Sequence, residues 1–182
     1  MFKSQHGIDR FLSPSAGKCI MQHVNRIFAL LLFGLMPPYS HLPLVQTVGQ
    51  NYKEIKTKYK ELQIFDIGGS QQLRVLWPDY VISADSIFFV IDGGAKDRFE
   101  EASSELKKLL PTISQRHIPL IIIANKCDTI AFETMETIIS VFKPLLNDLK
   151  NSSIFRVSAF TGEGVVECLN KIVLQESNQK GI

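Results

Sequence analysis

The sequence has few cysteines, no strong charge bias and no long apolar run, and each of these absences excludes a class of protein. Its three cysteines, Cys19, Cys127 and Cys168, are far apart and odd in number, which argues against a disulfide framework or a zinc site and favours a reducing compartment. The formal net charge of +2 is too small to indicate a nucleic-acid partner. The most apolar run, Ile27–Met36, has ten residues, whereas a membrane-spanning helix needs about 20.

The chain also lacks recognisable targeting signals. No apolar stretch directly follows the first basic residues, so a signal peptide is not indicated. Phe2 stands where N-myristoylation requires glycine, and the last residues, Gln179–Ile182, form no prenylation box. The four histidines share no metal-ligand spacing. The 182 residues, of which 45% are hydrophobic, are enough for one well-packed domain. We therefore expect a single cytoplasmic domain over residues 1–182.

Beyond residue 60 the sequence alternates between strand-like and helix-like segments. Short apolar runs predict strands at residues 62–67, 86–92, 119–124 and 154–157. Apolar residues at helical spacing predict helices at residues 97–110, at 132–149 and from 165 onward. Pro111 should stop the first helix, and Pro144 should kink or break the second. The alternation predicts a doubly wound α/β domain, with a mostly parallel sheet, helices on both faces, and ligands bound at the carboxyl ends of its strands.

The first 60 residues are less regular. Residues 45–57 and 59–67 can pair as one antiparallel hairpin around Lys58. Residues 19–36 can form a helix that becomes wholly apolar, and the three prolines of residues 37–44 cannot continue it.

An Asn-Lys-Cys-Asp sequence directly follows the predicted strand at residues 119–124. Asp128 can accept two hydrogen bonds from the N1–H and 2-amino groups of guanine, a pair of donors that adenine lacks. Asn125 can meet the N7/O6 edge of the purine, and the stem of Lys126 can lie along the base. The alternative is a simple turn, because four residues with one variable position recur by chance.

Two other strand ends carry candidate residues. Asp66 can hold Mg²⁺ through water, and Gly69 leaves room for a terminal phosphate to approach its backbone N–H. After residues 154–157, Ser158 and Ala159 can offer a backbone N–H to the guanine carbonyl. Taken alone, the Asp66–Gly69 sequence is better explained by a turn after a strand, and the Ser158-Ala159 dipeptide carries no signal.

These motifs follow one another in a characteristic order. The chain contains Gly17-Lys18, Thr47-Val-Gly49, Asp66-x-Gly-Gly69, Leu73-Arg-x-Leu-Trp77, Asn125-Lys-x-Asp128 and Ser158-Ala159. This order resembles that of the small GTPases, and within them the Arf/Arl (ADP-ribosylation-factor-like) family. The resemblance covers roughly three quarters of the chain, with a well-matched core at residues 47–175, and implies a P-loop small-GTPase fold.

The resemblance implies a guanine-nucleotide switch that binds GTP or GDP with Mg²⁺. Thr47 would close over the γ-phosphate and Mg²⁺, Asp66 would hold the ion through water, and Gly69 would bond the γ-phosphate. The base would be read by five residues: Asn125, Lys126, Asp128, Ser158 and Ala159. Loss of the γ-phosphate would release both switch loops, and effector, exchange-factor and GTPase-activating proteins would read that change. We expect a monomer without nucleic-acid partners that acts in intracellular trafficking and can contact intracellular membranes peripherally.

The phosphate loop departs from the family pattern. The frame at residues 12–19 reads Leu-Ser-Pro-Ser-Ala-Gly-Lys-Cys, with leucine where a glycine is needed and a proline that lacks an N–H. Cys19 replaces the hydroxyl that should bind Mg²⁺, and a thiol serves this hard cation poorly. Gly17 and Lys18 remain, and Lys18 would pair with the β- and γ-phosphates; the alternative is a solvated surface lysine. Residues 6–11 make a poor buried strand before this loop.

Residues 1–46 form a divergent N-terminal part with surplus chain. More residues separate Lys18 from Thr47 than the family pattern has, and the surplus includes Ile27–Met36. An insert this apolar at the surface should be buried, touch lipid or bind a partner. An altered start or splice junction is the other explanation.

The catalytic position is a further departure. In the family a glutamine follows the two glycines and orients the attacking water; here that position is Ser70, and Gln71 and Gln72 follow too late. We therefore predict slow GTP hydrolysis, with Ser70 and Thr47 at the catalytic positions. Two other hypotheses are a pseudo-GTPase module that binds partners without cycling nucleotide, and a membrane-associated adaptor that uses Ile27–Met36.

Overall fold

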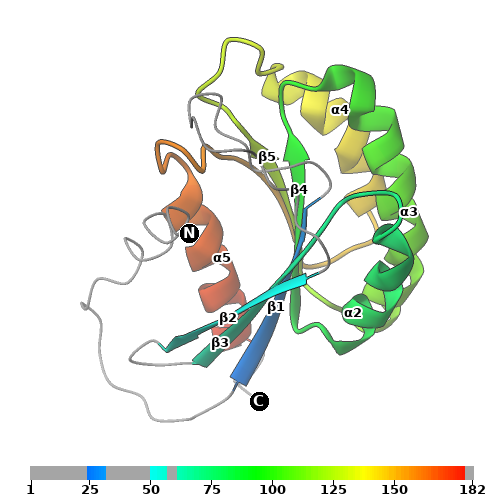
Figure 1. Ribbon diagram of the computed structural model, residues 1–182, viewed down its shortest axis with the longest axis vertical. Helices are drawn as coiled ribbons and strands as arrows, with labels where there is room; N and C mark the ends of the chain where they lie inside the picture. The colour runs from blue at the N-terminus through cyan, green and yellow to red at the C-terminus, as the bar shows by residue number, and fades with distance from the viewer. Residues whose placement is uncertain (1–23, 32–49, 57–60, 179–182) are drawn as a thin grey trace.

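The computed structural model describes residues 24–31, 50–56 and 61–178, and these form a six-stranded sheet with helices on both faces (Figure 1). The strands are β1 Val24–Leu31, β2 Gln50–Lys56, β3 Glu61–Ile67, β4 Ser86–Asp92, β5 Leu120–Asn125 and β6 Ser152–Arg156. Their order across the sheet is β2-β3-β1-β4-β5-β6. The expected hairpin is present, since β2 pairs antiparallel with β3, and all other neighbours are parallel. The sheet is therefore of the predicted doubly wound, mostly parallel type.

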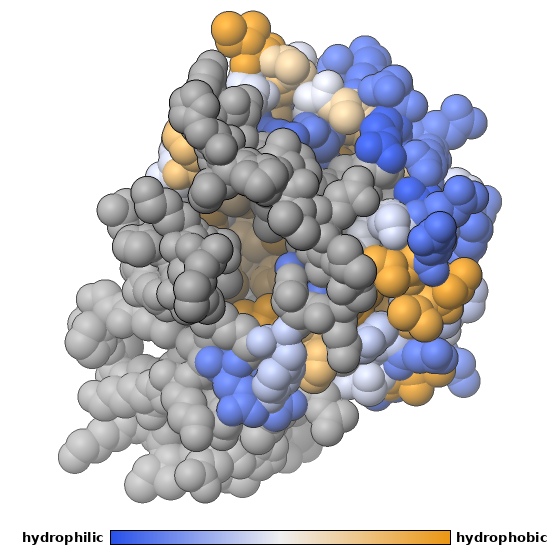
Figure 2. All heavy atoms as spheres, in the orientation of Figure 1, coloured by the Kyte–Doolittle hydropathy of each residue, from blue (hydrophilic) through white to orange (hydrophobic). Residues whose placement is uncertain are grey.

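The helices divide unequally between the two faces of the sheet. The described helices are α2 Trp77–Ser83, α3 Phe99–Gln115, α4 Met135–Leu146 and α5 Val165–Asn178, with 3-10 turns η1 Arg74–Leu76 and η2 Lys96–Arg98. In Figure 1, α2, α3 and α4 cover one face and α5 covers the other. Figure 2 shows hydrophilic residues over α3 and α4, as expected for helices that bury one apolar stripe and expose the rest.

The core follows from the alternation of side chains along β4. Ile87, Phe89 and Ile91 are buried with α2, α3 and α4, whereas Phe88 and Val90 are buried in a second cluster with residues of α5. Because successive side chains of a strand point to opposite faces, a strand covered on both sides must be apolar throughout. The apolar side chains of β4 therefore all pack in the core, and polar residues that could bind a ligand lie at the strand ends.

The prediction that Pro111 stops its helix is wrong. Pro111 lies inside α3, which continues to Gln115. Ile113, in the turn after the proline, is fully buried, and burying such a side chain contributes about 1.5–3 kcal/mol, comparable with the ~3 kcal/mol cost of proline in a helix. Pro144 lies inside α4, which ends two residues later at Leu146 and so before the predicted end at residue 149. A kink at Pro144 stays a prediction.

The main correction concerns the predicted apolar insert. Val24–Leu31 form β1, not a helix, and this strand lies in the middle of the sheet, with β3 paired to one edge and β4 to the other. Short apolar runs cannot be assigned to helix or strand by periodicity alone, and here the two partner strands decide. The helix, surface-insert and membrane-adaptor interpretations are therefore wrong for residues 27–31. Residues 32–36 lie outside the described residues.

Candidate functional site

The candidate site lies along the carboxyl edge of the parallel strands. β4 ends at Asp92 and β5 ends at Asn125, and these two residues are directly paired across the sheet. Residues 157–159 follow β6, and Gly68 and Gly69 follow β3. Because parallel strands end at the same edge of a sheet, polar residues distant in the sequence are brought together there.

Asn125 is held rigidly at the end of β5. Its side chain is buried, at 5% exposure, and its carboxamide oxygen accepts a hydrogen bond of 2.9 Å from the backbone N–H of Ala159. This bond joins the loop after β5 to the loop after β6. It also orients the amide so that its NH₂ group is the end that can donate to a ligand.

Asp128 is braced by the same neighbouring loop. The hydroxyl of Ser158, which is fully buried, donates to Asp128 Oδ1 at 2.5 Å, and the backbone N–H of Thr161 donates to that hydroxyl at 3.0 Å. Asp128 itself is exposed. The carboxylate is thus fixed in direction and still accessible, which is the arrangement needed to accept hydrogen bonds from a ligand.

Lys126 contacts a residue that the sequence analysis did not single out. Its ammonium group lies 2.7 Å from Asp92 Oδ2, and Asp92 Oδ1 accepts the backbone N–H of Gly94 at 3.0 Å. Lys126 also has a positive φ of 71°, an uncommon conformation outside glycine that the surroundings must stabilise. The sole sequence signal for Asp92 was its place at the carboxyl end of a strand.

The loop after β5 has further supports from Arg156. The Arg156 guanidinium donates to the Cys127 carbonyl at 3.3 Å, pairs with Glu163, and lies 5.6 Å from the centre of the Phe132 ring. Burial raises the pKa of the Cys127 thiol. Burial also raises the pKa of Cys168, in α5, to about 12. These two cysteines are therefore buried packing residues and poor nucleophiles.

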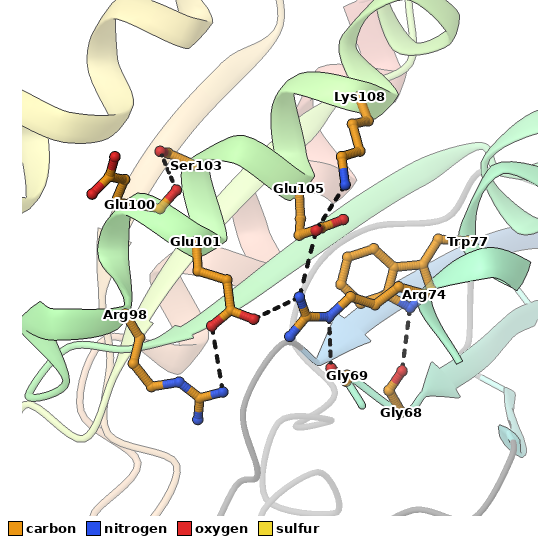
Figure 3. A network of polar contacts seen from close by, with 10 residues as sticks. All are labelled: Gly68, Gly69, Arg74, Trp77, Arg98, Glu100, Glu101, Ser103, Glu105 and Lys108. Carbon is orange, nitrogen blue, oxygen red and sulfur yellow. Dashed lines mark hydrogen bonds and ion pairs between the residues drawn. The ribbon is translucent and has the colours of Figure 1, made fainter. Parts of the chain in front are cut away.

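The turn after β3 is tied down by two side chains (Figure 3). The indole Nε1 of Trp77 donates to the Gly68 carbonyl at 3.2 Å, and Nε of Arg74 donates to the Gly69 carbonyl at 3.0 Å. Trp77 is buried, at 1% exposure, and contacts Phe89 edge to face, with ring centroids 6.3 Å apart. Trp77 therefore packs in the core and is not part of an exposed hydrophobic surface.

Ser70 begins the exposed part of this turn. Its backbone carbonyl accepts hydrogen bonds from the N–H groups of Leu73 and Arg74, at 2.9 and 3.2 Å, and its side chain is exposed. Asp66, in β3, is partly buried and lies opposite Ala29 of β1 in the sheet register. Asp66 thus lies near the carboxyl end of β1, and Ser70 follows four residues later in the turn after β3.

Four predicted site residues, Gly17, Lys18, Cys19 and Thr47, lie outside the described residues. The position of β1 nevertheless corrects the predicted phosphate loop. Such a loop follows the strand that supports it, but Gly17–Cys19 precede β1 in the chain, and both edges of β1 are already paired. Gly17–Cys19 therefore do not follow the central strand of the sheet, as a phosphate loop would.

One antiparallel hairpin at the edge of an otherwise parallel sheet, with polar residues gathered after the parallel strands, makes this a doubly wound α/β protein with a candidate ligand site at the strand ends. The model of the ADP-ribosylation factor family matches residues 39–176. The chain therefore belongs to the ADP-ribosylation factor family. A curated relative, ADP-ribosylation factor-like protein 3 of Saccharomyces cerevisiae, is 30% identical over 138 residues, which are 74% of this chain and 70% of that protein.

A solved structure agrees with this fold. The Arl6 BBS3 small GTPase of Trypanosoma brucei, determined with the bound nucleotide analogue GppNp, matches with a TM-score of 0.74. Its sequence identity is 23%, and the match covers 87% of this chain and 100% of that one. Within the described part of this chain, no helix has the length and apolar character needed to cross a membrane.

Proposed function

We propose that this chain is an Arf-like switch that binds GTP and GDP with Mg²⁺, hydrolyses GTP slowly and relays its state to effector proteins. The observation that carries the proposal is the braced edge after β5 and β6. Asn125 is held by the Ala159 N–H and Asp128 by the Ser158 hydroxyl. Neither contact is needed for a simple turn, and both orient groups that suit guanine.

The chemistry of these groups fits guanine better than adenine. An exposed carboxylate at Asp128 can accept from both N1–H and the 2-amino group, whereas adenine would present an acceptor at N1 and no 2-amino donor. The NH₂ group of Asn125 can donate toward N7 and O6. The Lys126 stem, held through its ammonium by Asp92, supplies an apolar surface for the base.

The phosphate end of the proposed ligand lies toward β3. Gly69 would offer its N–H to the γ-phosphate, and Asp66 would hold Mg²⁺ through water. Among the described residues no group of three or more His, Cys, Asp and Glu side chains could hold a metal alone. This agrees with Mg²⁺, which usually takes one or two carboxylates together with substrate phosphates and waters. Thr47, the other proposed ligand, lies outside the described residues.

Slow hydrolysis follows from Ser70. Its side chain is exposed and too short to orient a water as the glutamine of other family members does. Replacing Ser70→Gln should raise single-turnover GTP hydrolysis by at least about tenfold, since a transition-state hydrogen bond of about 1.4 kcal/mol corresponds to a factor of ten in rate. The exposed neighbour Gln71, changed to alanine, serves as the control and should leave the rate unchanged. A wild-type rate equal to that of ordinary small GTPases would contradict slow hydrolysis.

Effector, exchange-factor and GTPase-activating proteins would bind beside the phosphate end. Tyr52 of β2 and Val75, Leu76 and Ile82 around α2 are large apolar side chains exposed to solvent. Such residues favour protein contacts over plain hydration when they lie near a segment that changes state. We also propose that the protein is a monomer and that it contacts intracellular membranes peripherally.

A second candidate is a family member that binds partners without cycling nucleotide. Residues 32–49, which join β1 to β2, contain neither lysine nor arginine. The segment after the central strand therefore lacks the cation that a phosphate loop uses to hold the β- and γ-phosphates. This observation favours weak phosphate binding, whereas the braced guanine edge favours the switch.

Titration calorimetry separates the two candidates. The full chain would be titrated with GTP, GDP and ATP, each in the presence of Mg²⁺. The switch predicts heat with both guanine nucleotides and none with ATP at the same concentrations. Absence of binding for all three would overturn the switch and leave the partner-binding module.

A further inference from the structure

Two consecutive peptide groups after β3 are held by buried side-chain donors. The Gly68 carbonyl accepts from Trp77 Nε1 at 3.2 Å, and the Gly69 carbonyl accepts from Arg74 Nε at 3.0 Å. Trp77 is 1% exposed and the Arg74 side chain is 9% exposed. Figure 3 shows both donors approaching the glycine pair from the same side.

Holding these carbonyls also fixes the neighbouring N–H groups. The Gly68 carbonyl and the Gly69 N–H belong to one planar peptide group, and in a trans peptide they point in opposite directions. The described residues contain no cis peptide bond. When Trp77 binds the Gly68 carbonyl, the Gly69 N–H must therefore point away from the core. Arg74 fixes the next peptide in the same way, with the Ser70 N–H opposite the Gly69 carbonyl.

Arg74 also joins this turn to α3. Its Nη1 lies 2.8 Å from Glu101 Oε1 and 3.6 Å from Glu105 Oε1. The two carboxylates have further partners on the helix, because Arg98 approaches Glu101 at 3.6 Å and Lys108 approaches Glu105 at 2.8 Å. The guanidinium is thus buried with compensated charge, and its Nε is directed at the Gly69 carbonyl by the geometry of the fork.

We propose that Trp77 and Arg74 are positioning residues for recognition of the terminal phosphate. Together they orient the Gly69 N–H that would contact the γ-phosphate, and they anchor the Gly68–Gly69 turn to α3. This inference rests on the proposed nucleotide switch. Because a buried donor already holds each carbonyl, the peptide group is aligned before the ligand binds, and no further free energy is needed to orient it. Removing either donor should weaken GTP binding while leaving GDP binding unchanged.

The first test removes the indole N–H and keeps an aromatic ring. Trp77→Phe should lower the ratio of GTPγS to GDP affinity by about fivefold, the value of one hydrogen bond. The matched control is Phe142→Leu, which removes buried aromatic volume in α4 without contacting the glycine pair. The control should lower the thermal midpoint and leave the ratio unchanged. If Trp77→Phe binds both nucleotides with an unchanged ratio of GTPγS to GDP affinity, this inference is overturned and the proposed nucleotide switch is not.

The second test concerns the link to α3. Arg74→Gln should lower the same ratio by at least about fivefold, since hydrogen bonds from charged donors are stronger than neutral ones. Arg98→Gln is the control, because Arg98 contacts the same Glu101, and Figure 3 shows its guanidinium directed at that carboxylate and away from the glycine pair. Equal effects of the two variants would contradict a specific role for Arg74.

A nucleotide-free measurement keeps the inference testable if the proposed function fails. The chain has one tryptophan, so its indole N–H gives a single cross-peak in a ¹H–¹⁵N spectrum. The bond to Gly68 predicts slow hydrogen exchange of this proton in the wild-type protein, and a shift of the Gly69 amide in Trp77→Phe. Exchange at the rate of an exposed indole would overturn the positioning role, whatever the nucleotide titrations show. Absence of guanine binding together with a protected indole would overturn the proposed function and retain the oriented turn.

Discussion

At the scale of single residues, each predicted base-reading side chain has a partner that fixes its direction. Asn125 is bonded to the Ala159 N–H, Asp128 to Ser158 and Lys126 to Asp92. A recognition site gains from such partners because the side chains lose less freedom when a ligand binds. The candidate base-reading side chains are therefore preorganised by hydrogen bonds and do not belong to a flexible surface loop.

The contact between Lys126 and Asp92 gives the first prediction. Both side chains are largely buried, at 24% and 20% exposure. Asp92→Asn should keep the bond from the Gly94 N–H and lose the charge on the partner of Lys126, which should destabilise the protein by about 1–2 kcal/mol. Urea unfolding would measure this as a lower midpoint with an unchanged slope.

The matched control uses a more exposed ion pair. Lys96 and Glu133 lie 3.3 Å apart, and Lys96 is 62% exposed. Glu133→Gln should change stability by less than about 0.5 kcal/mol, because exposed pairs contribute little. Equal losses in Asp92→Asn and Glu133→Gln would show that Asp92 is an ordinary surface acid.

The sequence predicts the candidate ligand-contacting residues and assigns no role to the residues that support them. Asn125, Asp128 and Gly69 were found because their types and spacings follow strand ends. Asp92 and Arg74 were not, since each acts on a residue that only folding brings near: Lys126 for Asp92, and α3 for Arg74. No local pattern encodes such contacts, and they have to be read from the folded chain.

At the scale of elements, the loop between β6 and α5 depends on its backbone. Gly162 and Gly164 both have positive φ, at 86° and 72°. A Cβ at Gly164 would lie 2.2 Å from the Arg156 carbonyl oxygen, whereas one at Gly162 would meet nothing within 4 Å. The two glycines both have a positive φ but differ in the room available for a Cβ, so they form a matched pair for mutation.

This pair gives the second prediction. Gly162→Ala should destabilise the protein by about 1 kcal/mol, the cost of placing alanine in the left-handed region. Gly164→Ala should cost at least about 2 kcal/mol, because the clash with Arg156 adds to that strain. Urea unfolding of both variants compares them directly. A smaller loss in Gly164→Ala than in Gly162→Ala would contradict the described packing of this loop.

The contact between η1 and α3 has a pH dependence with a definite sign. The hydrogen bond from Arg74 lowers the pKa of Glu101 from its ordinary value of 4.5. A carboxylate with a lowered folded-state pKa stabilises the protein above its unfolded pKa, and this stabilisation is lost as the pH falls through the folded value. The difference in unfolding free energy between wild type and Glu101→Gln should therefore be constant above pH 4.5 and shrink in more acidic buffer. A difference that grows on acidification would contradict the ion pair.

The elements themselves were only partly predictable. The strands at β3, β4, β5 and β6 were predicted because short apolar runs end in turn residues. β1 was missed because Ile27–Leu31 belong to a longer apolar run without such a boundary, and only the pairing with β3 and β4 identifies the strand. Likewise α3 runs past Pro111 because Ile113 is buried, a tertiary effect that overrides the local propensity.

At the scale of the whole molecule, the sheet separates the two ends of the proposed nucleotide. The base edge follows β5 and β6, and the Gly68–Gly69 turn follows β3, with β1 and β4 between them. Three strand spacings separate β3 from β5, which is about 14 Å. A nucleotide lying across the carboxyl ends of the strands would thus cross the end of β1 at Leu31.

The central claim is that the edge after β5 and β6 recognises guanine through Asp128, and a change of base specificity tests it most directly. Xanthine carries a carbonyl where guanine has its 2-amino group, so the NH₂ of an asparagine can donate to it. Asp128→Asn should lose at least about tenfold in GDP affinity and gain affinity for xanthosine diphosphate, while the exposed Asp148→Asn should behave as wild type. Calorimetry of both variants with both nucleotides is the measurement. If Asp128→Asn binds GDP as the wild type does, or gains nothing for xanthosine diphosphate, guanine recognition by this edge is contradicted.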